Sequence, residues 1–270
     1  MQDSSYSPTF KALLGEANFT KQMLGAGATQ IRHAGYADMG IYPQAFTSLS
    51  TGLERIGKLC LMLDYYLENQ AFPDQSYMKN KIGHNISLIH EKTAEVVNRR
   101  KLQMEFLRAL TAPVHLSIIT ALSQFALGDR YSNINLLVGR DSSDPIAGWF
   151  ERVDKPLFET CVSASKKEKI LHNAGVAEMC LSSTSVALHI SETGEMITTM
   201  GEASLLTGIQ KAVAPYRQFY VLQIIRYWVE VLGALERSIE SRDIPAFGEV
   251  FAIFYNEDDM FRSRKTWDKL

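Results

Sequence analysis

Apolar residues recur every three or four positions along most of the chain, which is the spacing of amphipathic helices. The clearest stripe predicts a helix over residues 43–70 and consists of Phe46, Leu49, Leu53, Ile56 and Leu63. Pro43 suits the first turn of that helix. The segment 71–76 then interrupts the pattern, and Asp74 or Ser76 can cap the helix that follows.

A second stripe predicts a continuous helix that starts near residue 78. It consists of Met78, Ile82, Ile86 and Ile89. At about 100° per residue, Asn80 and His84 fall on nearly the opposite side of this helix. His84 is therefore expected to face solvent or a second surface, such as a groove or a partner subunit.

The remaining helical signals predict a bundle. Residues 114–127 read as another buried helix, whereas residues 128–145 contain the glycines and the Asp-Ser-Ser-Asp-Pro run that indicate loops. Residues 219–235 are apolar on nearly every face, which is typical of the central helix of a bundle. This segment also carries Arg226 and Glu230 and is short for a bilayer span, so we expect no membrane segment.

One β signal stands out, because Val186, Leu188 and Ile190 alternate with polar or small residues before a turn sequence. Two strands alone are marginally stable, so this hairpin must pack on helices or on a partner. The expected fold is all-α, a multi-helix bundle with a single β-hairpin insertion near residues 184–200. We expect residues 1–150 and 151–270 to form two helical regions that pack as one unit.

Composition and charge restrict the classes of function. The chain has 270 residues and a formal net charge of −2, which argues against a general nucleic-acid-coating protein but permits a local basic groove. Cys60, Cys161 and Cys180 are widely spaced, which favours reduced thiols in a cytoplasmic protein. Zinc-ligand spacings, phosphate-binding loops and HExxH or GxSxG motifs are lacking in the sequence. We therefore expect no metal and no cofactor.

The sequence Lys-Asn-Lys-Ile-Gly-His at residues 79–84 is the main candidate for chemistry. Histidine changes its charge near neutral pH, so His84 could take a proton from a ribose 2′-hydroxyl or return one to a leaving oxygen. Lys79 or Lys81 could stabilise the charge that develops at phosphorus, and Asn80 could fix the histidine ring. Alternatively, the segment is the polar side of an ordinary helix, and His84 packs against a neighbouring helix end.

Two further pairs of residues have both a functional and a structural interpretation. Glu54 and Lys58 lie four residues apart and form either a surface ion pair or a polar network near His84, and we favour the network. Arg130 and Tyr131 follow a helix end and could bind phosphate and stack a nucleic-acid base. For the second pair we favour the alternative, in which hydrogen bonds anchor the loop to the bundle.

The stretches FTSLSTGLERIGKLCLMLDYY at residues 46–66 and KNKIGHNISLI at residues 79–89 resemble HEPN-like helical domains. The resemblance extends from about Thr9 to Val153. It implies a helical bundle, commonly dimeric, of the kind found in toxin–antitoxin, anti-phage and RNA-processing proteins. Many such domains are metal-independent ribonucleases, whose motif is an arginine, a polar residue and then a histidine.

Lys79, Asn80 and His84 take the three places of that motif. The lysine is a departure, because arginine grips phosphate with two parallel hydrogen bonds whereas lysine is a point charge. The function that we expect first is therefore a non-catalytic HEPN-like module of a bacterial defence, toxin–antitoxin or mobile-element system, which dimerises or binds RNA or a partner protein. The lysine and the near-neutral charge favour it. The other hypothesis, favoured by the polar position of His84, is a metal-independent ribonuclease.

Overall fold

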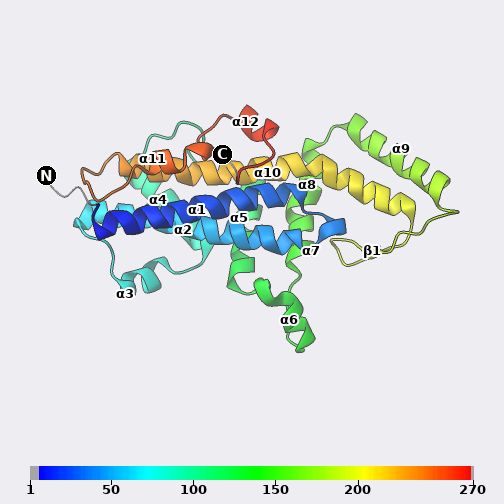
Figure 1. Ribbon diagram of the computed structural model, residues 1–270, viewed down its shortest axis with the longest axis horizontal. Coiled ribbons are helices and arrows are strands. Elements are labelled where there is room, and N and C mark those ends of the chain that lie inside the picture. The colour runs from blue at the N-terminus through cyan, green and yellow to red at the C-terminus, as the bar shows by residue number, and fades with distance from the viewer. Residues whose placement is uncertain (1–5, 269–270) are drawn as a thin grey trace.

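Three long helices run side by side along the bundle in the computed structural model, which describes residues 6–268 (Figure 1). They are α1 (Pro8–His33), α2 (Ile41–Asn69) and α10 (Met200–Glu236). The stripe in residues 43–70 is thus confirmed as one helix. Tyr42 to Asp64 supply its buried side, and Gln70 ends it in the left-handed conformation.

Shorter elements surround the three long helices (Figure 1). The other helices are α3 (Gln75–Tyr77), α4 (Ile86–Arg100), α5 (Pro113–Leu127), α6 (Ser132–Leu137), α7 (Pro145–Trp149), α8 (Lys155–Cys161), α9 (Ala164–Leu181), α11 (Phe247–Val250) and α12 (Asp258–Ser263). π-Helical turns lie at Met78–Ile82 and Phe150–Asp154. The strands β1 (His189–Ile190) and β2 (Met196–Ile197) pair antiparallel, with His189 opposite Ile197. The expected all-α bundle with one hairpin is confirmed.

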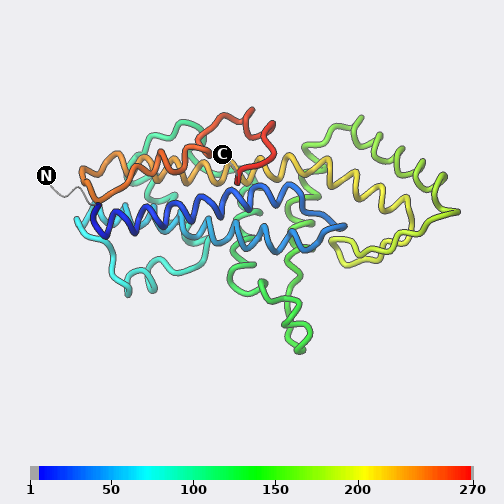
Figure 2. The backbone as a smooth tube through the Cα atoms, in the orientation of Figure 1, coloured from blue at the N-terminus to red at the C-terminus, as the bar shows by residue number. Residues whose placement is uncertain are grey.

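One large apolar core joins the first and last thirds of the chain, and two small clusters lie beside it. The large core contains residues from Leu13 in α1 to Trp267 near the C-terminus. Residues 219–235 of α10 are buried on nearly every face, as the sequence predicted for a central helix. Figure 2 shows the last segment of the chain returning along α10 and α1. Both predicted helical regions therefore contribute to the same core.

Two glycines allow α1 and α2 to pack closely. A methyl group on Gly27 of α1 would lie 2.6 Å from Cγ of Leu49 on α2. In the opposite direction, a methyl group on Gly52 of α2 would lie 2.6 Å from Cδ2 of Leu24 on α1. Glycine costs a helix about 1 kcal/mol relative to alanine. Here each glycine makes room for a leucine of the other helix, so packing offsets that cost.

A buried ion pair connects the long helices to the turn at residues 150–154. Arg217 of α10 is fully buried and donates from Nη1 to Asp154 Oδ2 at 2.8 Å and to Tyr42 Oη at 3.0 Å. Its Nη2 donates to the carbonyl of Ala34, at the end of α1. Trp149 Nε1 donates to the other oxygen of Asp154 at 3.1 Å. Burial raises the pKa of Asp154, and the charge of Arg217 opposes that rise.

The hairpin packs on this cluster through one face only. The ring of His189 meets the ring of Tyr36 edge-on, with 5.5 Å between the centroids. The hydroxyl of Tyr42 donates to Glu192 Oε1 at 3.4 Å, and Ile197 is buried near Tyr36. The hairpin thus satisfies the expectation that it packs on helices, with strands shorter than the sequence alternation predicts.

The expectation of a continuous helix from residue 78 is wrong. Gly83 has a φ of +71°, a left-handed conformation that strongly favours glycine, and it separates the π-helical turn from α4. Ile82 and Ile86 are both buried although they lie on either side of the break. The apolar stripe therefore continues across two elements, and His84 lies in the connection between them.

Removing the cation of the buried pair is expected to destabilise the fold strongly. Arg217→Met leaves the Asp154 carboxylate buried without a charge partner, so we expect the free energy of unfolding to fall by about 3–5 kcal/mol in urea denaturation. The double variant Arg217→Met/Asp154→Asn leaves no unpaired charge and is expected to regain part of this loss. An Arg217→Met protein as stable as the wild type would contradict the role given to the pair.

His90 of α4 is expected to make stability depend on pH. It is buried against Tyr227 and Trp228, its Nδ1 has no hydrogen-bond partner among residues 6–268, and burial lowers its pKa from 6.5 to about 4. The unfolded chain binds the proton first, so this contribution to stability is present above pH 6.5 and is lost toward pH 4.

The test compares urea denaturation of the wild type and His90→Gln over that pH range. The variant should lose less stability than the wild type between pH 6.5 and pH 4.5, by roughly 2 kcal/mol. His115, whose pKa burial also lowers, is present in both proteins, and its charge adds to the lowering of the His90 pKa. Parallel stability curves would show that His90 titrates normally.

Candidate functional site

The candidate site lies where α4 begins beside the middle of α2. Gly57 of α2 faces Ile89 of α4 so closely that a methyl group on Gly57 would overlap the Ile89 side chain. This contact brings the start of α4 against the α2 face that carries Glu54 and Lys58. Gly57 thus positions the site, although the apolar stripe of this helix gave no indication that this glycine would matter.

Hydrogen bonds hold the chain on both sides of His84. Asn85 caps α4 by accepting from Leu88 N at 3.1 Å, and it also accepts from Ser123 Oγ of α5 at 3.0 Å. On the other side, Lys92 Nζ donates to the carbonyl of Lys81. The short connection between the π-helical turn and α4 is therefore fixed to two neighbouring helices.

Three polar side chains meet at this connection, and we call them the His84 cluster: Glu54, Lys58 and His84. Glu54 Oε1 lies 2.7 Å from Lys58 Nζ and 2.9 Å from His84 Nδ1. Lys58 Nζ lies 3.2 Å from the same ring nitrogen. The side chains of Glu54 and Lys58 are only 22% and 18% exposed, whereas that of His84 is 74% exposed.

This geometry assigns the tautomer of His84. Because Nδ1 is closer to a carboxylate oxygen than to the ammonium group, it carries the proton and donates to Glu54. Lys58 then donates to the same carboxylate and balances its charge. The other ring nitrogen, Nε2, has no hydrogen-bond partner among residues 6–268, and it belongs to an exposed side chain. A histidine held in this way can accept or donate a proton at Nε2.

Asn80, Lys79 and Lys81 do not join the His84 cluster. Asn80 Nδ2 donates to Ser76 Oγ at 3.1 Å, so Asn80 does not fix the histidine ring, and Glu54 has that role instead. Lys79 is exposed at the surface. Lys81 lines a different pocket of about 270 Å³ near Arg99, of which His84 is not a lining residue.

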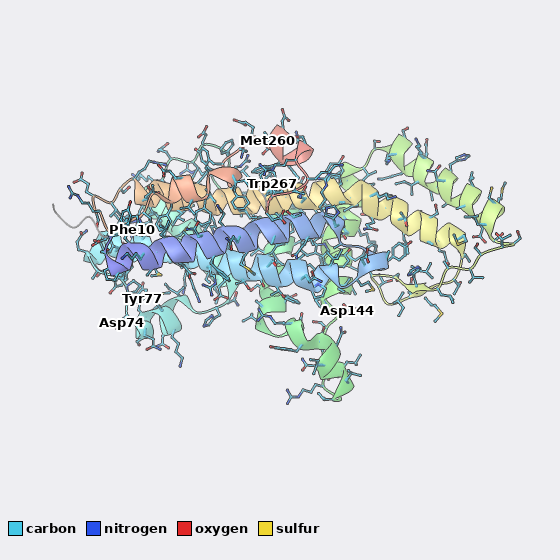
Figure 3. The ribbon with its side chains drawn as sticks, viewed as in Figure 1. Phe10, Asp74, Tyr77, Asp144, Met260 and Trp267 are labelled. Carbon is cyan, nitrogen blue, oxygen red and sulfur yellow. The ribbon has the colours of Figure 1, made fainter. Side chains whose placement is uncertain are left out.

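Arg130 and Tyr131 are distant in the sequence from the His84 cluster and lie on a segment that projects from the bundle. Both are exposed, and neither side chain forms a hydrogen bond with residues 6–268, so they do not anchor the loop as we favoured from the sequence. They precede α6, which extends away from the bundle on the same long side as α3 (Figure 1). Figure 3 labels Asp74 and Tyr77, which mark the α3 segment.

Within residues 6–268, no group of three or more His, Cys, Asp and Glu side chains has the arrangement of a metal site. In the same part of the chain, no helix combines the length and apolar character needed to cross a bilayer. The residue that sequence reasoning missed is Asn85, which ties the His84 connection to α5. Its position directly before an apolar stripe is a capping signal that could have revealed it.

Comparisons of the chain with protein-family models, with curated proteins and with solved structures found no match.

Proposed function

We propose that this protein is a HEPN-like, metal-independent ribonuclease in which His84 transfers the proton. The observation that carries the proposal is the 2.9 Å contact between Glu54 and His84 Nδ1, on a histidine whose side chain is 74% exposed. A carboxylate that orients a histidine while leaving Nε2 free is an arrangement suited to general acid–base catalysis. This contact supports the catalytic hypothesis, in a form in which Glu54 and not Asn80 orients the histidine.

The proposed reaction uses the nucleophile that RNA itself carries. His84 Nε2 takes the proton of a ribose 2′-hydroxyl, and that oxygen attacks the adjacent phosphorus atom. The bond to the 5′-oxygen breaks, and the leaving oxygen takes a proton from water or from His84 of a second copy. The products are a 2′,3′-cyclic phosphate and a free 5′-hydroxyl. Each step is proton transfer or displacement, so no metal ion is needed.

Positive side chains around the connection supply the binding part of the proposal. Lys79 and Lys81 are exposed on the turn that precedes His84 and can meet phosphate oxygens as point charges. Arg130 and Tyr131, on the segment that projects from the same side, offer a second contact for a phosphate and a base. Cytoplasmic RNA is the substrate that we propose, in keeping with three free cysteines.

RNA cleavage in EDTA is expected to depend on His84. His84→Ala removes the group that transfers the proton, so the cleavage rate of a labelled single-stranded RNA should fall by about 100-fold or more. Glu54→Gln keeps the size of the side chain but removes its charge, and it should lower the rate while shifting the pH profile. The matched control is His172→Ala, which removes an exposed histidine of α9 and should leave the rate unchanged.

End-group analysis provides an independent readout, because the proposed reaction leaves a 2′,3′-cyclic phosphate. Cleavage that persists in His84→Ala, products with a 5′-phosphate, or a folded wild-type protein without any cleavage would each overturn the proposal. The first hypothesis, a non-catalytic binding module, would then remain for the His84 cluster.

Dimerisation is a second candidate function, and the hairpin favours it. The alternating residues Val186, Leu188 and Ile190 face solvent together with Met196, whereas the opposite face packs on Tyr36. We propose that a second copy of the chain covers this apolar face. A symmetric contact buries the same patch on both copies, and a net charge of −2 gives little repulsion between them.

The oligomeric state tests this second candidate. Leu188→Ser/Met196→Ser should weaken the dimer in sedimentation or light scattering by at least about tenfold, because it removes two exposed apolar side chains from the contact. Leu137→Ser is the control, since Leu137 of α6 is even more exposed, at 85%, but lies on another segment. A monomeric wild type, or a dimer sensitive only to Leu137→Ser, would contradict the hairpin contact.

A further inference from the structure

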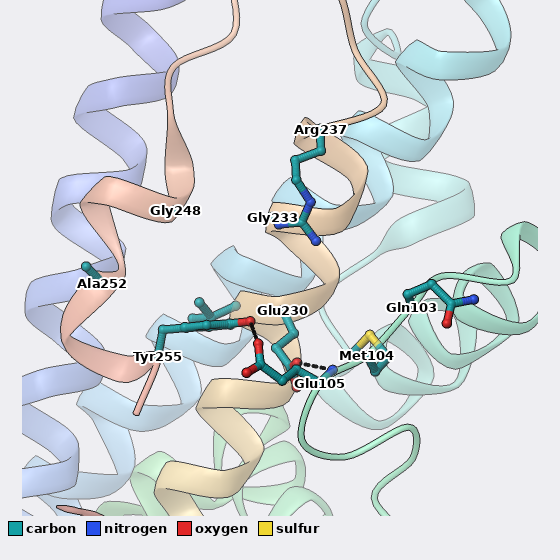
Figure 4. Close-up of a pocket in the computed structure, with 10 residues that line it drawn as sticks. Gln103, Met104, Glu105, Glu230, Gly233, Arg237, Gly248, Ala252 and Tyr255 are labelled. Carbon is teal, nitrogen blue, oxygen red and sulfur yellow. Dashed lines mark hydrogen bonds between the residues drawn. The ribbon is translucent and has the colours of Figure 1, made fainter. Parts of the chain in front are cut away.

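A cavity of about 530 Å³ lies beside the C-terminal half of α10, away from the His84 cluster (Figure 4). The segment at residues 103–105 forms one wall, and the segment at residues 248–255 forms the other. This volume is typical of sites for small molecules. Its lining is mixed, with apolar Met104 and Val229 next to charged Glu230 and Arg237.

The anionic group of this cavity is a buried carboxylate with one oxygen unpaired. Glu230 is 5% exposed, and its Oε1 accepts from the backbone N–H of Glu105 at 2.7 Å and of Phe106 at 3.2 Å. Its Oε2 is buried and has no hydrogen-bond partner among residues 6–268. Glu230 lines the cavity, and a buried carboxylate that lacks a donor is costly, so a ligand whose donor reaches this carboxylate would gain from pairing with it.

The cationic group is Arg237, an exposed residue that caps the C-terminal end of the same helix and lines the mouth of the cavity. Arg237 follows Glu230 by seven residues, a rise of about 10 Å on the same side of α10. Its side chain folds back toward Glu230, since a methyl group on Gly233 would lie 3.5 Å from Nη1, and Figure 4 shows the guanidinium over that glycine. Arg237 forms no ion pair with the residues that the structure describes, 6–268.

A second carboxylate strengthens the negative end. Tyr255 donates a hydrogen bond to Glu105 Oε2, and Figure 4 shows these two side chains beside Glu230. Burial raises the pKa of Glu230, while the hydrogen bonds from the backbone lower it. The cavity therefore has two carboxylates at one end, Glu230 with an unpaired oxygen and Glu105. At the other end it has a guanidinium that forms no ion pair within residues 6–268.

We propose that this cavity binds a free amino acid with an apolar side chain, whose ammonium group pairs with Glu230 and whose carboxylate pairs with Arg237. Each charged end of the ligand then makes one charge-assisted hydrogen bond, about 2.8 Å long. The side chain of the ligand then contacts Met104 and Val229. A peptide N-terminus lacks the free carboxylate and leaves Arg237 unpaired.

Calorimetric titration with each of the twenty L-amino acids tests the proposal on the full chain. Leucine or methionine is expected to bind, and Glu230→Gln and Arg237→Gln should each weaken that binding by about tenfold or more. The amide oxygen that Glu230→Gln introduces can still accept the two backbone hydrogen bonds, so this variant should fold. Arg242→Gln is the matched control, because Arg242 is exposed beyond the end of α10.

Two analogues separate the two charged contacts. Leucinamide has the ammonium group but no carboxylate, so its weaker binding should be insensitive to Arg237→Gln. 4-Methylpentanoate has the carboxylate but no ammonium group, and its binding should be insensitive to Glu230→Gln. The proposal is overturned when no apolar amino acid binds the folded protein at millimolar concentration, or when both variants bind leucine like the wild type. RNA cleavage by Glu230→Gln reports separately on the His84 cluster.

Discussion

The buried ion pair between Arg217 and Asp154 is the interaction on which the arrangement of the long helices depends. The guanidinium contacts the end of α1 through the Ala34 carbonyl and α2 through Tyr42. Two charges inside a protein are costly to desolvate and are tolerated only when hydrogen bonds surround them. A helix that shifted by about one ångström would leave a charge unpaired. The pair therefore selects one position of α10 along α1 and α2, and the apolar core then packs around that position.

Two helices of this arrangement carry the groups that matter for function. α2 holds Glu54 and Lys58 against the start of α4. These residues lie further along the helix than Tyr42, through which α2 contacts the ion pair. α10 holds Glu230 in its buried half, and Arg237 is the exposed residue that caps the end of the helix. Both pairs lie on rigid elements, so a partner of either site meets groups whose positions are already determined. Preorganisation of this kind lowers the entropy cost of binding and of proton transfer.

The fold could be predicted from the sequence where regular spacing decides it, and the site only in part. The stripe of α2 and the all-round apolar character of residues 219–235 indicated the correct helices. The break at Gly83 was missed because Ile82 and Ile86 continue the stripe across it, and a positive φ leaves no trace in apolar spacing. The Glu54–His84 contact depends on how closely α4 approaches Gly57, which is a property of tertiary packing. Glu230 was used only to exclude a membrane segment, since its partners lie more than 100 residues earlier.

The reciprocal glycine contacts of α1 and α2 have a consequence for how this chain can vary. Gly27 and Leu49 fill one shared volume, and Gly52 and Leu24 fill another. Neither member of such a pair can change its size alone without creating a clash or a void, both of which destabilise a core. Substitutions at these positions should therefore be tolerated as compensated pairs, with a smaller residue on one helix answering a larger one on the other. The distance between the two helices is therefore set by pairs of residues that must vary together, and not by single residues.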